Sequence, residues 1–308
     1  MKTPRWFLSR NLISYALYPL SLVYYVATRL VFNVRKMREI KSRRPIICFG
    51  NILSGGVGKT PIVRKMAKFF DAPVVMRGYK KSRYTDNVGD EAKMLMRDDI
   101  LVHVGDRRSN IVLLNKQKSN TPIIMDDGFQ NSSIHKDISV LVFDESIGFG
   151  NGFLLPAGPL REMPSAMERA DAIIVIKRKK IARQFSLPEN IPVFYAENKD
   201  ICPYDENTPV VVFAGIGYPE KFFANVPVKI VEKISFPDHY QYSDQDIKDL
   251  IKIADEKNAK LLTTEKDWVR LPYWAQKKIK FSVLNTEIDK DFYDWVKGKL
   301  NDIDNKKN

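Results

Sequence analysis

Cysteine is scarce in this chain, with Cys48 and Cys202 the only two among 308 residues. They lie far apart in the sequence and match no metal-binding spacing, which leaves two buried, reduced thiols as the simplest interpretation. That pattern is typical of a protein in a reducing compartment. Internal repeats are also absent, and the only low-complexity stretch is the polar tail at 301–308. The sequence therefore predicts an ordinary globular protein with room for one large domain or two smaller ones.

Acidic residues are too few to balance the basic ones, and the formal net charge at pH 7 is +13. An excess of this size suits a nucleic acid or an anionic membrane surface as a partner. No patch interleaves aromatic and basic side chains, as nucleic-acid-binding modules do. We therefore expect no nucleic-acid partner.

Charge is missing altogether between Arg10 and Arg29, where the sequence is NLISYALYPLSLVYYVAT (11–28). This run is borderline in length and polarity for a helix that spans a bilayer. Its tyrosines and flanking cations favour a helix lying on an anionic lipid surface. An ordinary buried helix and a true membrane span stay open as alternatives. A cleaved signal peptide is disfavoured, because a nucleotide-binding loop follows almost at once.

From residue 45 onward, short apolar runs alternate with amphipathic segments. The predicted strands are 45–51, 72–79, 100–104, 122–127, 138–144, 172–177 and 192–197, and the predicted helices are 58–70, 89–97, 105–117 and 165–170. Most of the strands are continuous Ile- and Val-rich runs, which is typical of strands buried on both faces of a sheet. The alternation with helices indicates an α/β fold of the P-loop NTPase type, with a mostly parallel sheet covered by helices.

A second unit begins near Pro203, within the polar, proline-bounded stretch CPYDENTP (202–209), which we interpret as a linker. It contains predicted strands at 210–216, 228–236, 259–265 and 280–285, a helix over 243–257 with Ser243 as its N-cap, and a final helix from Lys290. We therefore expect three parts: an N-terminal membrane-associated helical segment (1–44), a P-loop nucleotide-binding domain (45–202) and a smaller α/β C-terminal domain (203–308).

The stretch ILSGGVGKTP (52–61) lies between a predicted strand and a predicted helix, where a P-loop belongs. The residues that we expect to surround the nucleotide phosphates are Ser54, Gly55, Gly56, Val57, Gly58, Lys59 and Thr60. Lys59 would bridge the terminal phosphates, and Thr60 would reach Mg²⁺. The first glycine of the motif is absent, because Leu53 stands in its place, but some P-loop families lack it too. Ser54 occupies the position where ParA/MinD-like ATPases have lysine, which counts against that dimerising switch.

Two aspartates, Asp126 and Asp127, end the buried run in PIIMDDGFQN. Adjacent acids at a strand end are unfavourable unless a cation lies nearby, and in P-loop folds such an acid holds the Mg²⁺ shell. An Asp-Gly turn would explain Asp127 but not Asp126. We expect a metal or phosphate site here.

Less specific signals come from four other positions. Asp90 and Glu91 open a predicted helix, where acids are ordinarily capping residues. Arg77 begins RGY (77–79), the last three residues of the second predicted strand, where a phosphate contact and an ordinary surface arginine are equally compatible with the sequence. His239 lies in a predicted turn after Asp238, which could orient its ring.

Eight motifs, in order, resemble the tetraacyldisaccharide 4'-kinases, also called lipid A 4'-kinases. They are FGNILSGGVGKTP (49–61), RGY (77–79), GDE (89–91), DDGFQ (126–130), LLPAGPLRE (154–162), FAGIGYPEKFF (213–223), FPDHY (236–240) and TTEKDWVRL (263–271). Each motif is weak alone, but eight in sequence over most of the chain are specific.

The resemblance implies transfer of the γ-phosphoryl group of ATP, with Mg²⁺, to the 4'-hydroxyl of a tetraacylated glucosamine disaccharide 1-phosphate in lipid A biosynthesis. It also implies a peripheral enzyme on the cytoplasmic face of the bacterial inner membrane, in keeping with the run at 11–28. We expect it to act as a monomer. The alternative from a different class is a membrane-bound P-loop ATPase switch without a lipid acceptor.

The family pattern also implies residue roles. The implied catalytic residues are Asp90, His239 and Lys59, the implied metal residues are Thr60, Glu91, Asp126 and Asp127, and Arg77 is an implied phosphate contact. Asp90 would accept the sugar hydroxyl proton late in the transfer, with His239 as its partner from the second domain. Two positions depart from the family: Val57 replaces a common Ser or Thr, and Lys80 replaces a common Gly.

Overall fold

The computed structural model describes residues 4–78, 88–178, 185–217 and 219–306. Tyr79 and Lys80, the end of the RGY motif and the departure beside it, lie outside the described residues. The chain divides into a larger unit, Pro4–Glu197 with Thr286–Asn308, and a smaller unit that contains Asn198–Asn285. Each unit is described by itself.

The larger unit is built on a parallel sheet, as expected from its continuous apolar runs. In spatial order its strands are β3 (Val102–Val104), β2 (Val74–Met76), β4 (Ile123–Asp126), β1 (Ile46–Gly50), β5 (Ile138–Asp144), β6 (Ala172–Lys177) and β7 (Val193–Ile201). Each neighbouring pair runs parallel. The carboxyl ends of the strands therefore meet at one edge, where ligands bind in open α/β sheets.

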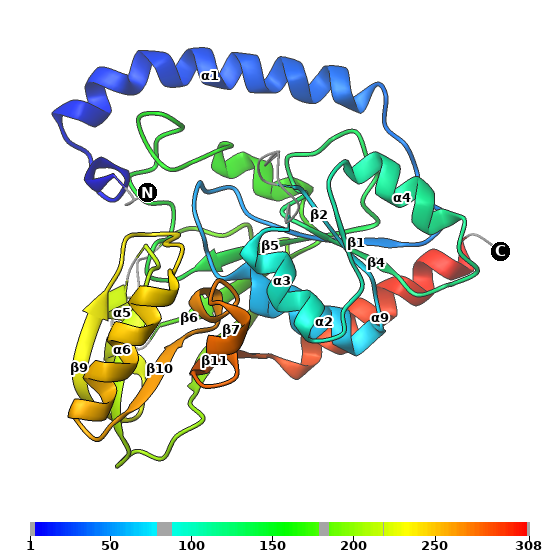
Figure 1. The fold of residues 1–308 in the computed structure, drawn as a ribbon. Helices are drawn as coiled ribbons and strands as arrows, with labels where there is room; N and C mark the ends of the chain where they lie inside the picture. The colour runs from blue at the N-terminus through cyan, green and yellow to red at the C-terminus, as the bar shows by residue number, and fades with distance from the viewer. Residues whose placement is uncertain (1–3, 79–87, 179–184, 218, 307–308) are drawn as a thin grey trace. The chain divides into compact units, whose positions relative to one another are not determined.

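Helices cover both faces of this sheet (Figure 1). They are α2 (Lys59–Phe70), α3 (Asp90–Arg97), α4 (Arg107–Asn115) and α9 (Lys290–Asn305), with a 3₁₀ turn at η2 (Pro164–Arg169). Alternate β1 residues show the two faces: Ile47 packs in one core cluster with α2 and α9, while Ile46 packs in another with α4. Burial on both faces explains why these strands have apolar side chains throughout.

The N-terminal helix α1 (Leu12–Lys36) runs beyond the uncharged stretch, and Asn11 caps it through a capping box with Ser14. Its serine side chains face the protein and most of its apolar side chains face outward, the reverse of a core-packing helix. The buried side chains are Ser14 and Ser21, whereas Leu12, Val23 and Leu30 are 88%, 66% and 61% exposed. An 18-residue window of α1 is apolar enough to cross a membrane, and 6% of that window is buried. An ordinary core helix is therefore excluded, while a helix on the surface and one that spans stay compatible.

The strands of the smaller unit also run parallel, in the order β11 (Lys280–Ile288), β10 (Lys260–Thr264), β8 (Pro209–Ala214) and β9 (Lys229–Ser235). Its helices are α5 (Pro219–Asn225), α6 (Asp244–Glu256), α7 (Glu265–Trp268) and α8 (Tyr273–Gln276). Ser243 caps α6, as predicted. The α6 side chains pack on one face of the sheet, and Phe222 and Phe223 of α5 pack on the other.

The predicted α/β fold is confirmed. The observed division differs from the expected parts 1–44, 45–202 and 203–308: residues 4–44 group with the larger unit, the chain enters the smaller unit after Glu197, and it returns to the larger unit at Thr286. The helix α9 groups with the larger unit, because Phe292 and Val296 pack in its core. Both cysteines are free thiols, as expected, but only Cys48 is buried and Cys202 is half-buried.

Candidate active site

The P-loop follows the carboxyl end of β1, and α2 begins at Lys59. Gly55 and Gly58 have φ angles of 110° and 84°, in the region that favours glycine, so the loop can turn its backbone toward an anion. Leu53 is fully buried and bridges to Leu160, which explains the missing first glycine: its side chain belongs to the core. Val57 is buried as well, so its side chain also packs inward.

Asp127 lies at the turn after β4, where two cations contact its carboxylate. Lys59 Nζ is 3.1 Å from Oδ1, and Arg161 Nη1 is 3.0 Å from Oδ2. Burial alone would raise the pKa of Asp127, but Lys59 and Arg161 outweigh it and lower the pKa to about 2. The carboxylate is therefore ionised at any physiological pH and holds the P-loop lysine at the end of the neighbouring strand.

Asp126 is in the opposite situation, although it is adjacent in sequence. It is 5% exposed, and its Oδ1 has no hydrogen-bond partner in the part of the chain that the structure describes. Burial raises its pKa to about 7, and the Glu91 and Asp127 carboxylates add to this against the effect of Lys59. A buried carboxylate with an unsatisfied oxygen is suited to a cation ligand.

Arg107, the first residue of α4, is a site residue that the sequence analysis missed. Its Nη2 atom donates to the backbone carbonyls of Asp126 at 2.7 Å and Asp127 at 3.0 Å. Burial lowers its pKa, and Arg77 is close enough to lower it further. Arg107 thus stabilises the turn that positions the two aspartates. Because it contacts their backbone carbonyls, these contacts produce no recognisable sequence motif.

The remaining predicted residues of the larger unit lie at the same edge of the sheet. Asp90 and Glu91 form the first turn of α3, and Glu91 is within electrostatic reach of Asp126. Thr60 follows Lys59 in α2, and Arg77 is exposed just beyond β2. Within the described residues, no group of three or more His, Cys, Asp or Glu side chains is arranged to hold a metal by itself.

A second polar cluster contacts the backbone at Asn51, just before the P-loop. Asn51, Gln130 and Glu162 belong to motifs that the sequence analysis gave without assigning these residues a role, whereas Arg169 lies outside the motifs. Gln130 Nε2 donates to Asn51 O at 2.8 Å and to Glu162 Oε1 at 3.0 Å. Arg169 holds Glu162 at 2.6 Å. The sequence signal was present in DDGFQ and LLPAGPLRE, but the pairing of these two segments depends on the fold.

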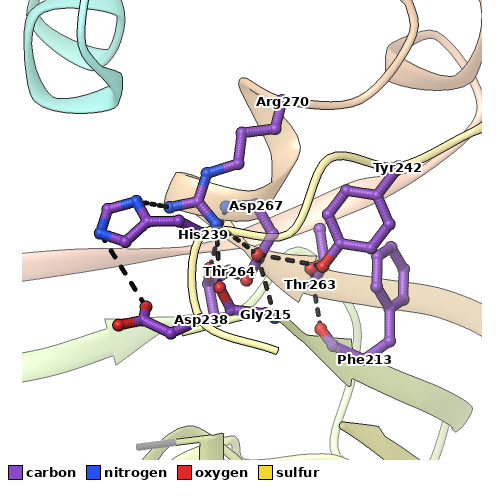
Figure 2. A network of polar contacts seen from close by, with 9 residues as sticks. All are labelled: Phe213, Gly215, Asp238, His239, Tyr242, Thr263, Thr264, Asp267 and Arg270. Carbon is purple, nitrogen blue, oxygen red and sulfur yellow. Dashed lines mark hydrogen bonds and ion pairs between the residues drawn. The ribbon is translucent and has the colours of Figure 1, made fainter. Parts of the chain in front are cut away.

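His239 lies in the smaller unit, in the turn that follows β9 (Figure 2). Its φ is 59°, and its backbone N–H donates to Gly215 O at 3.0 Å. Asp238, the expected orienting residue, is 4.0 Å from Nε2, whereas Arg270 Nη2 is 3.3 Å from Nδ1. Arg270 is therefore the nearer of the two side chains, and sequence adjacency pointed to the more distant one.

Comparison with known proteins identifies the family. A family model described as tetraacyldisaccharide-1-P 4'-kinase matches residues 13–301. The chain belongs to the tetraacyldisaccharide-1-P 4'-kinase family. The resemblance drawn from the eight motifs is thereby confirmed, as is its assignment as an enzyme of the kinase class.

Relatives in this kinase family match along most of their length. The tetraacyldisaccharide 4'-kinase of Paramagnetospirillum magneticum is 38% identical, over 94% of this chain and 95% of the relative. Those of Rickettsia bellii and Gluconobacter oxydans are 34% and 33% identical, over 87% and 91% of this chain and 89% and 91% of theirs. A crystal structure described as "apo" form LpxK from Aquifex aeolicus in complex with ATP is 25% identical, with a TM-score of 0.73, covering 95% of this chain and 99% of that one.

Proposed function

We propose that this chain transfers the γ-phosphoryl group of ATP to the 4'-hydroxyl of tetraacyldisaccharide 1-phosphate in lipid A biosynthesis, as its family membership indicates. The observation that supports it most is the contact between Lys59 and Asp127. This contact joins the P-loop to the acidic end of β4. As a result Lys59, which would bind phosphate, lies near Asp126, the candidate metal ligand. The relative from Aquifex aeolicus, described in complex with ATP, supports ATP as the donor.

The P-loop would bind the phosphates through its backbone N–H groups and the N-terminus of α2. Lys59 would meet the terminal phosphates, and its contact with Asp127 holds it at the site beforehand. Arg77, exposed just past β2, would add a further phosphate contact.

The residues at the strand end fit a magnesium ion. Asp126 offers a buried carboxylate oxygen without a hydrogen-bond partner in the described chain, and Glu91 and Thr60 lie at the same edge. Magnesium typically takes one or two carboxylates plus phosphates and water, so a complete protein ligand set is unnecessary. When bound, Mg²⁺ would neutralise charge on the phosphate oxygens. Of the two aspartates, Asp127 has the weaker claim as a ligand, since Lys59 and Arg161 already hold it.

In the transfer step, the 4'-hydroxyl oxygen forms a bond to the γ-phosphorus while the bond to the ADP oxygen breaks. The hydroxyl proton passes to Asp90, which needs to accept it only late in the reaction. His239 would serve as the partner of Asp90. The two residues belong to different units, so their meeting would require both units to contribute to the bound state.

Helix α1 would lie on the cytoplasmic face of the inner membrane and hold the enzyme there as a peripheral protein. Its outward apolar side chains and the basic residues at its carboxyl end, Arg35 and Lys36, suit an anionic lipid surface. At that surface the enzyme would reach an acylated substrate embedded in the same membrane. We infer a monomer that acts on this lipid and binds no nucleic acid.

The test is to follow γ-labelled ATP in the presence of Mg²⁺ and detergent-solubilised tetraacyl disaccharide 1-phosphate. The kinase assignment predicts label in a bisphosphorylated lipid, and Lys59→Ala should abolish it. Lysine-dependent release of labelled inorganic phosphate, with no labelled lipid, would favour the ATPase-switch alternative.

The catalytic roles are tested separately. Asp90→Ala and His239→Ala should each lower kcat by about 10²-fold or more while ATP affinity changes little. Near-normal kcat in either variant would remove that residue from the mechanism without affecting the assignment as a kinase.

A further inference from the structure

We propose that Arg270 is a positioning residue that fixes the orientation of the His239 ring and makes Nδ1 its acceptor. This inference rests on the proposed role of His239 in the transfer reaction. The observation behind it is a polar network in the smaller unit that joins TTEKDWVRL to FPDHY (Figure 2).

The centre of this network is a buried ion pair. Asp267 and Arg270 have side-chain exposures of 0% and 3%, with 3.1 Å between Oδ1 of the acid and Nη1 of the arginine. Three other donors satisfy the carboxylate: Gly215 N and Tyr242 Oη reach Oδ1 at 3.0 Å, and Thr264 Oγ1 reaches Oδ2 at 2.6 Å. A buried pair with this many partners is rigid, because breaking any contact leaves a buried polar group unsatisfied.

The guanidinium of Arg270 extends this rigidity to His239 at two points. Nη1 donates to Gly215 O at 2.9 Å, and this carbonyl also accepts the backbone N–H of His239 at 3.0 Å. Nη2 lies 3.3 Å from Nδ1 of the His239 ring. His239 has a φ of 59°, which is unusual for a residue other than glycine. The Arg270 guanidinium therefore stabilises this backbone conformation through Gly215 O and also contacts the ring.

The direction of the ring contact follows from the chemistry of the arginine. A guanidinium has only donors, so Nδ1 must accept, and a proton on the neutral ring must lie on Nε2. The His239 side chain is otherwise 69% exposed, and its Nε2 end points away from Arg270 toward Asp238 (Figure 2). A ring held in this way presents an N–H donor to a carboxylate, which is what a partner for Asp90 needs.

Close packing around Gly215 gives this arrangement little freedom. A Cβ atom at this position would approach Tyr242 Oη at 3.0 Å and both Asp267 Oδ1 and Pro237 O at 3.1 Å. Arg270 is also the only arginine, and His239 the only histidine, in the sequence from 198 to 285. Substituting either residue therefore removes the only side chain of its kind from this unit.

The experiment is a double-mutant cycle on the full-length enzyme, with steady-state kinetics for lipid phosphorylation. Its variants are Arg270→Lys, His239→Ala and the two combined. Lysine keeps a charge beside Asp267, but one ammonium cannot reproduce the fork that reaches Gly215 O and His239 together. Lys257→Gln is the matched control, because it removes a cation of the same unit from an exposed 3.2 Å pair with Glu232.

We expect Arg270→Lys to lower kcat at least about tenfold and to leave the KM values for ATP and lipid within about threefold. In the His239→Ala background the same substitution should lower kcat no further, because Arg270 acts through the ring. Lys257→Gln should match the wild type.

Two results would overturn the inference: an unchanged kcat in Arg270→Lys while His239→Ala is impaired, or equal losses in both backgrounds. A normal kcat in His239→Ala would instead remove the proposed role of His239 and this inference with it. Should Arg270→Lys fail to fold, Asp267→Asn with Arg270→Gln replaces the buried ion pair by a neutral one. This double variant should then lower kcat in the wild-type background and lower it no further in the His239→Ala background.

Discussion

The Nζ atom of Lys59 lies 3.1 Å from Oδ1 of Asp127, which joins the phosphate loop to the end of the neighbouring strand. Arg161 contacts the same carboxylate at 3.0 Å. Asp126, one residue earlier, is buried, and its Oδ1 has no hydrogen-bond partner among the residues that the structure describes. The two adjacent aspartates therefore differ in role. Asp127 pairs with the Lys59 and Arg161 side chains, whereas Asp126 is suited to bind a metal ion.

Asp127→Asn should destabilise the protein at neutral pH. The folded-state pKa of about 2 lies below the ordinary 3.8, so the carboxylate contributes stability above pH 4 that is lost as the pH falls through 2. We expect a loss of about 2 kcal/mol at pH 7 that shrinks at pH 3, measured by urea denaturation. Asp205→Asn, at an exposed position, is the control. An equal loss at both pH values would contradict the account.

Asp126→Asn should have the opposite effect on stability and remove activity. Its pKa of about 7 lies above 3.8, so the folded state binds the extra proton and wild-type stability falls as the pH rises from about 4 to 7. The asparagine variant lacks this loss and should melt about 3 °C or more above the wild type at pH 8, with a smaller difference at pH 5. Its Mg²⁺-dependent transfer should fall by about 10²-fold or more. A melting temperature of Asp126→Asn below that of the wild type at pH 8 would contradict this account.

The outward face of α1 should govern membrane binding. Val23→Glu with Leu30→Glu places two charges where the side chains are 66% and 61% exposed, so folding should be unaffected while vesicle binding weakens. Cosedimentation with anionic vesicles measures this. Leu101→Glu, at a 55% exposed apolar position outside α1, should bind as the wild type does. Equal sedimentation of all three proteins would mean that α1 is not the anchor.

Ser21 should hold α1 against the larger unit. Its hydroxyl donates to Leu154 O at 2.8 Å and accepts from Ala157 N at 3.2 Å, in a buried setting. Ser21→Ala removes the partner of the Ala157 N–H, while Leu154 O keeps its bond from Gly158 N at 2.9 Å. The substitution should cost about 1–3 kcal/mol, seen as faster amide hydrogen exchange in α1. Thr28→Ala is the control, since among the described residues the Thr28 hydroxyl donates only to carbonyls of its own helix. Exchange as slow as in the wild type would show that Ser21 does not hold the helix.

Much of the fold could be predicted because each buried strand is a continuous apolar run, and the P-loop is recognisable from a few glycines and Lys59. The sequence could not show that Arg107 aims the two aspartates, because it does so through backbone carbonyls. Nor could the sequence show that α9 packs in the core of the larger unit, because an amphipathic pattern predicts a buried helix face but not the element that covers it. His239 was found by resemblance, whereas its contact with Arg270 joins segments that only the fold brings together.

The most direct test of the central claim is to determine where the phosphate is attached. The lipid recovered after incubation with ATP and Mg²⁺ would be analysed by proton–phosphorus correlation NMR. Our account predicts a new phosphomonoester coupled to the 4'-proton of the distal sugar in the wild-type product, and none with Lys59→Ala. Unchanged lipid together with inorganic phosphate, or a phosphate at another hydroxyl, would contradict it.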